Sequence, residues 1–230
     1  RVPIIVRWPA GIPAGRRVED FVSVTDLGPT LLDLAGVETD IFMDGQSFLP
    51  QLTSTASGWI NPSRDFVVIG RERHVPTARP DYLPYPMRAI RSKDFLYIRN
   101  FKPDRWPQGN PGLAGEITDS AALYEMGKET RTAYQDLDGS LTKAWLLAHR
   151  ESSEVSHSIA MTLELRPAEE LYALSDDPHH LNNLATDETY REQLESFRTQ
   201  VTTLMEETND PRLTDAFDKA PWVTPEDANR

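Results

Sequence analysis

Hydrophobic residues follow two kinds of spacing in the first 70 positions of this 230-residue chain. Residues 2–8 and 66–70 are short, continuous apolar runs rich in β-branched side chains, a pattern typical of strands buried on both faces of a sheet. Between them, apolar residues recur at helical spacing from Thr25, which suits the start of a helix, to Gly36, which suits its end. The order strand, helix, loop, strand predicts part of an open α/β sheet, with residues 2–8 as a central parallel strand.

The pattern changes near residue 81. Residues 87–92 and 95–101 are strand-like and are separated only by Lys93 and Asp94, which favours an antiparallel hairpin. The segment 102–115 is rich in proline and glycine and predicts a long surface loop. We expect helix between residues 120 and 149 and a further strand over residues 163–174.

A long amphipathic helix is the clearest element, and it follows Thr186 or Asp187. One stripe of this helix carries its apolar residues: Tyr190, Leu194, Phe197, Val201, Leu204 and Met205. We expect it to pack on the small antiparallel sheet. The acidic, proline-punctuated tail, residues 209–230, is expected to lie extended or to fray.

These patterns predict an α/β protein with two parts. Residues 1–80 are expected to form part of an open α/β domain, and residues 81–230 a smaller α+β subdomain with an antiparallel sheet, a packed helix and an extended tail. The chain opens on Arg1 within an apolar run, with no initiator methionine or signal peptide before it, so we interpret it as a fragment.

Composition removes several classes of function. A net charge of −12 argues against nucleic acid as a partner, because a phosphate backbone is bound through clustered lysine and arginine. No apolar run approaches the ~20 residues of a membrane span. The absence of cysteine excludes disulfides, a zinc–thiolate site and a cysteine nucleophile within these residues.

Five short motifs resemble the sulfatase family. Residues 1–11 (RVPIIVRWPAG), 24–36 (VTDLGPTLLDLAG) and 44–50 (DGQSFLP) resemble the stretch that follows the metal site in sulfatases. Residues 170–178 (ELYALSDDP) and 182–185 (NNLA) resemble the C-terminal signature of the family. The resemblance therefore spans nearly the whole chain and implies the C-terminal part of an alkaline-phosphatase-like sulfatase fold.

Within the family, three further motifs resemble the heparan N-sulfatases, which remove sulfate from N-sulfoglucosamine. These motifs are residues 85–88 (YPMR), 183–187 (NLATD) and 207–211 (ETNDP). The resemblance implies a sulfated carbohydrate as substrate and an exported, periplasmic or lysosomal-type location. It also implies that the full-length enzyme uses a formylglycine nucleophile and a calcium ion.

The chain departs from the family at the groups that perform the chemistry. The family nucleophile lies in Cys-x-Pro-x-Arg or Ser-x-Pro-x-Arg, and the nearest string here, Ile60-Asn-Pro-Ser-Arg64, carries isoleucine at the first position. The calcium ligands of the family lie upstream of the matching motifs. We therefore assign no catalytic residue and no metal ligand, and we expect this chain to bind no cofactor and to be inactive alone.

Candidate substrate-binding residues follow the second predicted strand. Ligands of open α/β sheets bind beyond the carboxyl ends of strands, where this chain places Arg71, Glu72, Arg73 and His74. Residues 71–105 contain nine Lys or Arg and four Asp or Glu, a local balance of +5 that suits an anionic, sulfated sugar. The competing interpretation is that Arg71 and Glu72 form a structural ion pair and that His74 caps a loop.

Other residues are weaker candidates. Arg88 is also a substrate-binding candidate. Both Arg88 and Arg91 either face the substrate or lie on an exposed face of the hairpin. The paired His179 and His180 lie in an evident turn without a ligand-spaced carboxylate, so we expect them to be exposed to solvent. Three aromatic residues could stack on a sugar or cover a small core: Tyr82, Tyr85 and Trp106.

The sequence leaves three functions open. The first is a sulfatase, in which this chain supplies part of the substrate-pocket wall and closes the fold. The second is another aryl- or glycan O-sulfatase or a related phosphohydrolase of the same superfamily. The third is a non-catalytic domain that binds an acidic glycan or a protein through residues 71–105.

Overall fold

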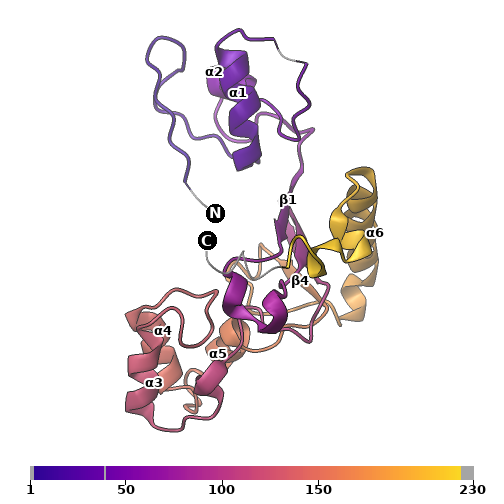
Figure 1. Cartoon of the computed structure of the whole chain (residues 1–230). Helices are drawn as coiled ribbons and strands as arrows, with labels where there is room; N and C mark the ends of the chain where they lie inside the picture. Colours follow the sequence, from indigo (N-terminus) through magenta and orange to yellow (C-terminus); the bar gives the residue numbers. More distant parts are fainter. Residues whose placement is uncertain (1–2, 39, 224–230) are drawn as a thin grey trace. The chain divides into compact units, whose positions relative to one another are not determined.

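The computed structural model describes residues 3–38 and 40–223, which divide into two compact units, Arg1–Val67 and Val68–Arg230 (Figure 1). The division falls inside strand β1 (Phe66–Arg71), ahead of the predicted domain limit after residue 80. Residues 68–80 belong to the second unit because Arg71 and Arg79 both bind Asp136, which lies deep in that unit.

The first unit is organised around the buried carboxylate of Asp26. This residue ends a 3₁₀ turn (η1, Val24–Asp26) and precedes α1 (Leu27–Leu34), and the unit also contains α2 (Leu49–Thr53). The Asp26 carboxylate accepts hydrogen bonds from the amides of Ser23 (2.6 Å) and Gln46 (2.9 Å) and from the guanidinium of Arg64 (2.6 Å). One carboxylate thus joins three segments of the unit.

The predicted helix is confirmed, with a different start. It begins at Leu27 after the 3₁₀ turn, and Thr25 lies inside that turn with its hydroxyl donating to Ser23. Gly36 follows the helix with φ of +67°, a conformation that glycine adopts without steric cost. The helix starts later than predicted because a 3₁₀ turn precedes it, and in this turn Asp26 accepts the hydrogen bond from the amide of Ser23.

The first predicted strand is wrong. Val2 lies outside the described residues, and residues 3–8 are not a strand in the structure. Their side chains are exposed, and Ile5 reaches 92%. A strand is stable only when a neighbour pairs with it, and no described residue forms a ladder with this segment, so its apolar pattern is not realised as a buried strand.

The second unit contains a four-stranded sheet in the order β1-β2-β3-β4, where β2 is Met87–Ser92, β3 is Phe95–Asn100 and β4 is Glu169–Ala173. The predicted hairpin is confirmed, because β2 and β3 pair antiparallel, as do β3 and β4. Strand β1 is confirmed as a strand, but the prediction that it is buried on both faces is wrong. It lies at the edge of this sheet, where Val68 and Ile69 are about half exposed.

The long helix α6 (Arg191–Glu207) packs on one face of the sheet, as predicted, and follows a 3₁₀ turn (η5, Glu188–Tyr190). Its ring of Phe197 stacks on Tyr97 of β3 at 6.0 Å and 8°. Four residues of the predicted stripe are buried: Leu194, Phe197, Val201 and Met205. Side chains alternate along a strand, so Leu96 and Ile98, on either side of Tyr97 in the sequence, point to the opposite face of the sheet.

A helical lobe carries α3 (Ser120–Gly127), α4 (Leu141–Ala148) and α5 (Ser156–Leu163). The helical prediction over residues 120–149 is confirmed for α3 and α4, which are separated by an irregular segment. They approach so closely that a Cβ on Gly127 would lie 2.4 Å from the Cα of Ala144. The strand predicted from residue 163 is wrong in its first part, because Leu163 ends α5 and is buried in the core of the lobe.

The C-terminal segment is the main departure from the predicted architecture. Residues 209–223 fold into two 3₁₀ turns, η6 (Pro211–Thr214) and η7 (Ala216–Asp218), and Arg212 is buried within them. The predicted extended or frayed tail is therefore wrong for these residues, while 224–230 lie outside the described residues. Short 3₁₀ turns also occur in the loops: η2 (Pro76–Ala78), η3 (Pro80–Tyr82) and η4 (Gly112–Gly115).

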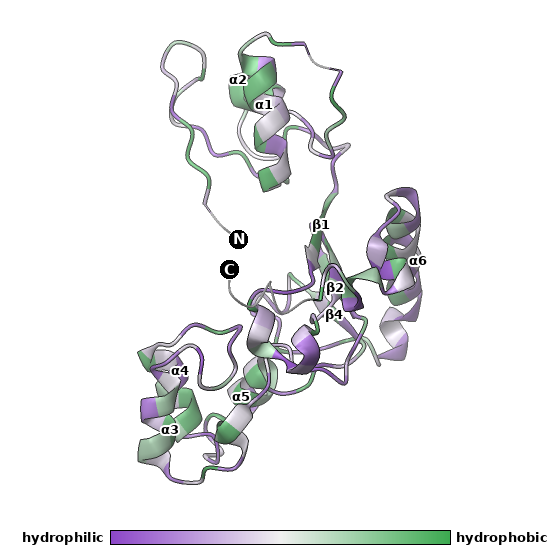
Figure 2. Cartoon of the chain, viewed as in Figure 1, coloured by the Kyte–Doolittle hydropathy of each residue, from purple (hydrophilic) through white to green (hydrophobic). Residues whose placement is uncertain are grey.

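Apolar side chains are buried very unevenly in the two units. Figure 2 shows hydrophobic residues along α1 and α2, yet Phe48 is the only apolar side chain that is buried among the described residues before Val68. In the second unit the lobe and the sheet each have a buried apolar cluster. No helix in the described ranges is long and apolar enough to cross a membrane.

Candidate functional site

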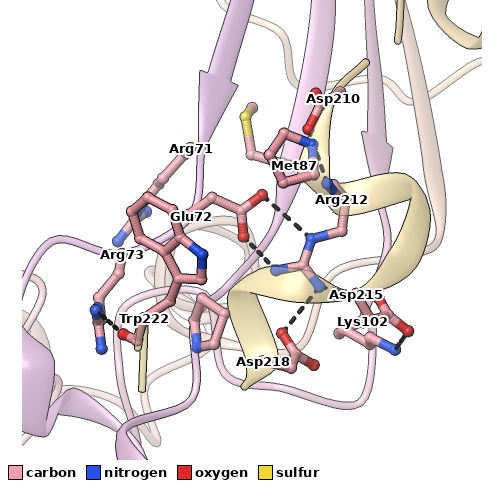
Figure 3. Close-up of polar contacts among 12 residues, drawn as sticks. Arg71, Glu72, Arg73, Met87, Lys102, Asp210, Arg212, Asp215, Asp218 and Trp222 are labelled. Carbon is pink, nitrogen blue, oxygen red and sulfur yellow. Dashed lines mark hydrogen bonds and ion pairs between the residues drawn. The ribbon is translucent and has the colours of Figure 1, made fainter. Parts of the chain in front are cut away.

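The candidate loop begins at the last residue of β1, and its centre is Glu72. The carboxylate of Glu72 accepts hydrogen bonds from Nε (3.2 Å) and Nη2 of Arg212 (Figure 3). Its Oε1 also lies 2.8 Å from Nη2 of Arg88. Two arginines from distant parts of the chain therefore hold one carboxylate. The backbone is held as well, because the carbonyl of Glu72 accepts a 2.6 Å hydrogen bond from the amide of Tyr85.

Arg212 is the hub of this ionic network. Its side chain is fully buried, and besides Glu72 it donates to Asp218 (2.8 Å) and Asp215 (2.9 Å). Asp215 also binds Lys102, and Asp218 binds Arg105. Burial alone would lower the pKa of Arg212, but its carboxylate partners outweigh this effect and raise the pKa above its usual value.

Arg88 on β2 makes the second contact with Glu72. Its Nε and Nη2 donate to the two oxygens of Asp210 at 2.6 and 2.8 Å, a bidentate arrangement that fixes the plane of the guanidinium. Burial raises the pKa of Asp210, whereas the hydrogen bond from Arg88 lowers it, and the net pKa is below the usual value. Arg88 is thus engaged on both sides by carboxylates of the second unit.

Arg71 is held by a different carboxylate. Asp136, whose side chain is fully buried, accepts hydrogen bonds from Arg71 (2.8 Å), Arg79 (2.7 Å) and the amide of Val75 (2.7 Å). Burial lowers the pKa of Arg79, and the charge of Asp136 partly offsets that effect. Asp136 therefore joins the end of β1 to the loop that follows the candidate residues.

The last two residues of the candidate loop differ in their environment. Arg73 donates to the backbone carbonyls of Tyr82 (3.2 Å) and Trp222, so the C-terminal segment reaches this side of the loop as well (Figure 3). His74 is exposed, and its side chain makes no hydrogen bond or ion pair with any residue that the structure describes. Among the five candidates, His74 is the side chain presented to solvent.

The structure thus brings Glu72 and Arg88 together but not all five predicted residues. Arg88 lies on the α6 face of the sheet, whereas Arg71 lines a pocket with residues of the opposite face. The local excess of +5 is offset by carboxylates outside the segment, namely Asp136, Asp210, Asp215 and Asp218. A charge count over a window of sequence cannot show these partners.

Sequence reasoning missed Arg212, Asp136 and Asp210. The motif 207–211 resembles the heparan N-sulfatases, yet its acidic, proline-rich surroundings predict a surface tail. Three acidic residues spaced around one arginine, Asp210, Asp215 and Asp218, were the available signal. Nothing near Asp136 in the sequence indicates a partner 65 positions away.

Other candidates have structural roles. Trp106 packs edge-on against Tyr134 in the core of the lobe, and the ring of Tyr85 is buried beside Arg79. His180 lies 5.5 Å from the ring of Tyr172 and only 3.4 Å from a guanidinium nitrogen of Arg91, so it is partly covered. Within the described ranges no group of three or more His, Cys, Asp or Glu side chains is arranged to hold a metal ion.

Comparison with known proteins identifies the class. The family model "N-sulphoglucosamine sulphohydrolase, C-terminal" matches residues 1–63. An ulvan-active sulfatase of Formosa agariphila is 26% identical over 86% of this chain and 28% of its own length. Human N-sulphoglucosamine sulphohydrolase is 28% identical over 86% of this chain and 34% of its own length.

A solved structure extends the likeness to the fold. A protein crystallised with its substrate D-glucosamine-2-N,6-O-disulfate covers 94% of this chain with a TM-score of 0.51 and 18% identity, and 29% of that protein is covered. The chain therefore has an α/β fold like that of part of this solved protein, and in sequence it is similar to the C-terminal part of sulfatases. It corresponds to the C-terminal part of these enzymes and spans about a third of the length of the relatives quoted above.

Proposed function

We propose that this chain is the C-terminal part of a sulfatase that removes sulfate from a sulfated glycan, and that the group removed is the N-sulfate of glucosamine in heparan sulfate. The similarity to human N-sulphoglucosamine sulphohydrolase along most of the chain supports the substrate. The ulvan-active relative supports the broader class of sulfated glycans. In this proposal the sulfur chemistry, including any calcium ion and formylglycine, belongs to parts of the enzyme outside these residues.

The observation that carries the proposal is the contrast within the loop 71–74. Glu72 is held by two arginines and Arg73 by two carbonyls, whereas His74, next in the chain, is exposed. An exposed imidazole on a tightly held backbone can donate a hydrogen bond to a sulfate or sugar oxygen without a large loss of conformational entropy. We propose that His74 contacts the substrate and that Glu72 and Arg88 position it.

The first unit supports a role in closing the fold of a larger enzyme. Large apolar side chains are exposed along it, including Leu31, Phe42 (86%) and Ile5 (92%). Exposed apolar side chains in such number mark a surface that another part of a protein covers. We propose that the rest of the sulfatase domain covers these residues.

The third function left open by the sequence is not favoured. A polyanion-binding domain needs cations that are free to meet phosphate or sulfate groups, but Arg71, Arg79, Arg88, Lys102 and Arg105 all bind carboxylates of the same unit. These carboxylates compensate most of the positive charge, although Arg71 and Arg79 share the single carboxylate of Asp136. Within the superfamily, a sulfatase is distinguished from a phosphohydrolase by whether the enzyme releases sulfate or hydrolyses a phosphodiester.

The test uses the full-length enzyme that contains this chain. Sulfate release from N-sulfoglucosamine is compared with release from 6-O-sulfated glucosamine and with hydrolysis of a phosphodiester, and we expect the N-sulfated sugar to be preferred. His74→Ala should lower kcat/KM at least tenfold, since a hydrogen bond to a charged group contributes about 1.5–3 kcal/mol. His157→Ala, an exposed histidine on α5, is the matched control. Equal kcat/KM in the two variants would remove His74 from the site.

A further inference from the structure

A pocket of about 280 Å³ opens on the face of the sheet opposite α6. Its apolar floor is made by Met87, Leu96 and Ile98, which share that face because side chains alternate along β2 and β3. Met161 of α5 and Pro107 of the long loop form part of its wall. All of these elements belong to the second unit.

Tyr85 gives the pocket an unused polar group. The residue is 3% exposed and lines the pocket, and its hydroxyl has no hydrogen-bond partner in the described part of the chain. A buried hydroxyl without a partner costs about 1–3 kcal/mol. Burial, followed by the charge of Glu170, raises the pKa of Tyr85 above its usual value, so the hydroxyl remains a donor.

Four other polar residues of the lining bind one another around Glu170. Glu170 accepts hydrogen bonds from Asn100 (2.8 Å), from the hydroxyl of Tyr172 (2.5 Å) and from Arg166. Burial raises the pKa of Glu170, but these donors outweigh it and keep the carboxylate charged. This cluster forms a fixed polar wall. Tyr85 differs from it because its buried hydroxyl has no partner among the described residues, and the side chains of Gln108 and Thr162 also line the pocket.

The charge beside the pocket is positive. Asp136 is a single carboxylate shared by two guanidinium groups, those of Arg71 and Arg79. One positive charge therefore remains uncompensated within this triad, and Arg71, whose side chain is 29% exposed, brings it to the lining of the pocket. A second buried polar atom, Nη1 of Arg79, also lacks a hydrogen-bond partner in the described residues. It lies on the guanidinium that faces the ring of Tyr85.

An apolar floor, a hydroxyl donor and a positive edge together fit a pyranose ring that carries an acidic group. Sugar rings present apolar C–H faces and polar edges, and arginine binds carboxylate or sulfate well. We propose that this pocket is a second sugar-binding subsite, which holds the uronate or sulfated residue next to the one that is desulfated. The inference rests on the proposed function, because Arg71 joins the pocket directly to the loop 72–74.

The test measures how a neighbouring sugar affects turnover by the full-length enzyme. The wild type is compared with Tyr85→Phe on N-sulfoglucosamine and on a disaccharide in which N-sulfoglucosamine is linked to a uronate. We expect the ratio of disaccharide to monosaccharide kcat/KM to fall about tenfold in Tyr85→Phe, the loss of about one hydrogen bond. Tyr97→Phe is the control, since that hydroxyl binds Glu169 on the α6 face and should leave the ratio unchanged.

Two results would overturn the subsite. One is an unchanged ratio in Tyr85→Phe, and the other is an equal fall of the ratio in Tyr97→Phe. If the enzyme desulfates none of the substrates, the proposed function fails, and the pocket is then tested with glucuronic acid by saturation-transfer NMR. Binding that is weakened in Tyr85→Phe but not in Tyr97→Phe supports the pocket, and absence of binding to the wild type rejects it.

Discussion

Replacing Arg212 by methionine should destabilise the second unit by about 3 kcal/mol. Methionine keeps most of the apolar stem and removes only the guanidinium, which makes four hydrogen bonds to three carboxylates. Breaking a buried ion pair by removing one partner costs about 3–5 kcal/mol. The lower end applies here because each carboxylate keeps a second cation: Arg88 for Glu72, Lys102 for Asp215 and Arg105 for Asp218.

The measurement is urea unfolding of the wild type and of two variants, with Arg198→Met as the control. Arg198 also binds a carboxylate in a bidentate way, that of Glu169, but its side chain is 45% exposed. Exposed pairs contribute about 0–1 kcal/mol. We therefore expect Arg212→Met to lose at least about 2 kcal/mol more than Arg198→Met, the difference between those two ranges.

Hydrogen exchange gives a local measurement of the same effect. The amide of Tyr85 donates to the carbonyl of Glu72, so loss of the Arg212 anchor should speed exchange at Tyr85. Exchange in the centre of α6 should change less, because its packing on the sheet does not involve the guanidinium. Similar stability in Arg212→Met and Arg198→Met, with unchanged exchange at Tyr85, would refute the view that the C-terminal segment holds the candidate loop.

Two further changes test the same framework. Asp136→Asn should destabilise the protein by roughly 3 kcal/mol, because Arg71 and Arg79 lose their shared counter-charge. Thermal unfolding measures this change, and a loss of stability below about 1 kcal/mol would contradict the prediction. Lowering the pH should weaken the network, since the pKa of Asp210 and of Asp218 is lowered in the folded state. This stabilisation is complete above the unfolded pKa of about 4, and it is lost as the pH falls through the lower pKa values of the folded state. The urea midpoint of the wild type should therefore decline below pH ~4, and that of Arg212→Met should decline less steeply.

The elements predicted well from sequence are those that bury their apolar residues against nearby parts of the same unit. The hairpin is fixed by a two-residue connection, and its strands pair antiparallel as predicted. The stripe of α6 meets the sheet through Phe197 and Tyr97. In both cases the partner surface is made by residues that the structure places in the same unit, so periodicity was a sufficient guide.

The candidate site was harder to predict because its partners are distant in sequence. Residues 71–74 were found from their position after β1, but Arg212 binds Glu72 across 140 positions. Ion pairs leave no periodic trace, and an acidic segment after a helix has the same composition whether it is solvated or folded. Placing Arg88 and Arg71 on opposite faces required the sheet register, which fixes the face to which each side chain points.

The error at residues 3–8 has a different cause. An apolar, β-branched run reports only that its side chains avoid water, and it becomes a strand when another strand satisfies its backbone groups. In the first unit the order comes from polar contacts such as those of Asp26, and Phe48 alone is buried among its described apolar side chains. The same apolar pattern supports the proposal that another part of the enzyme covers this surface.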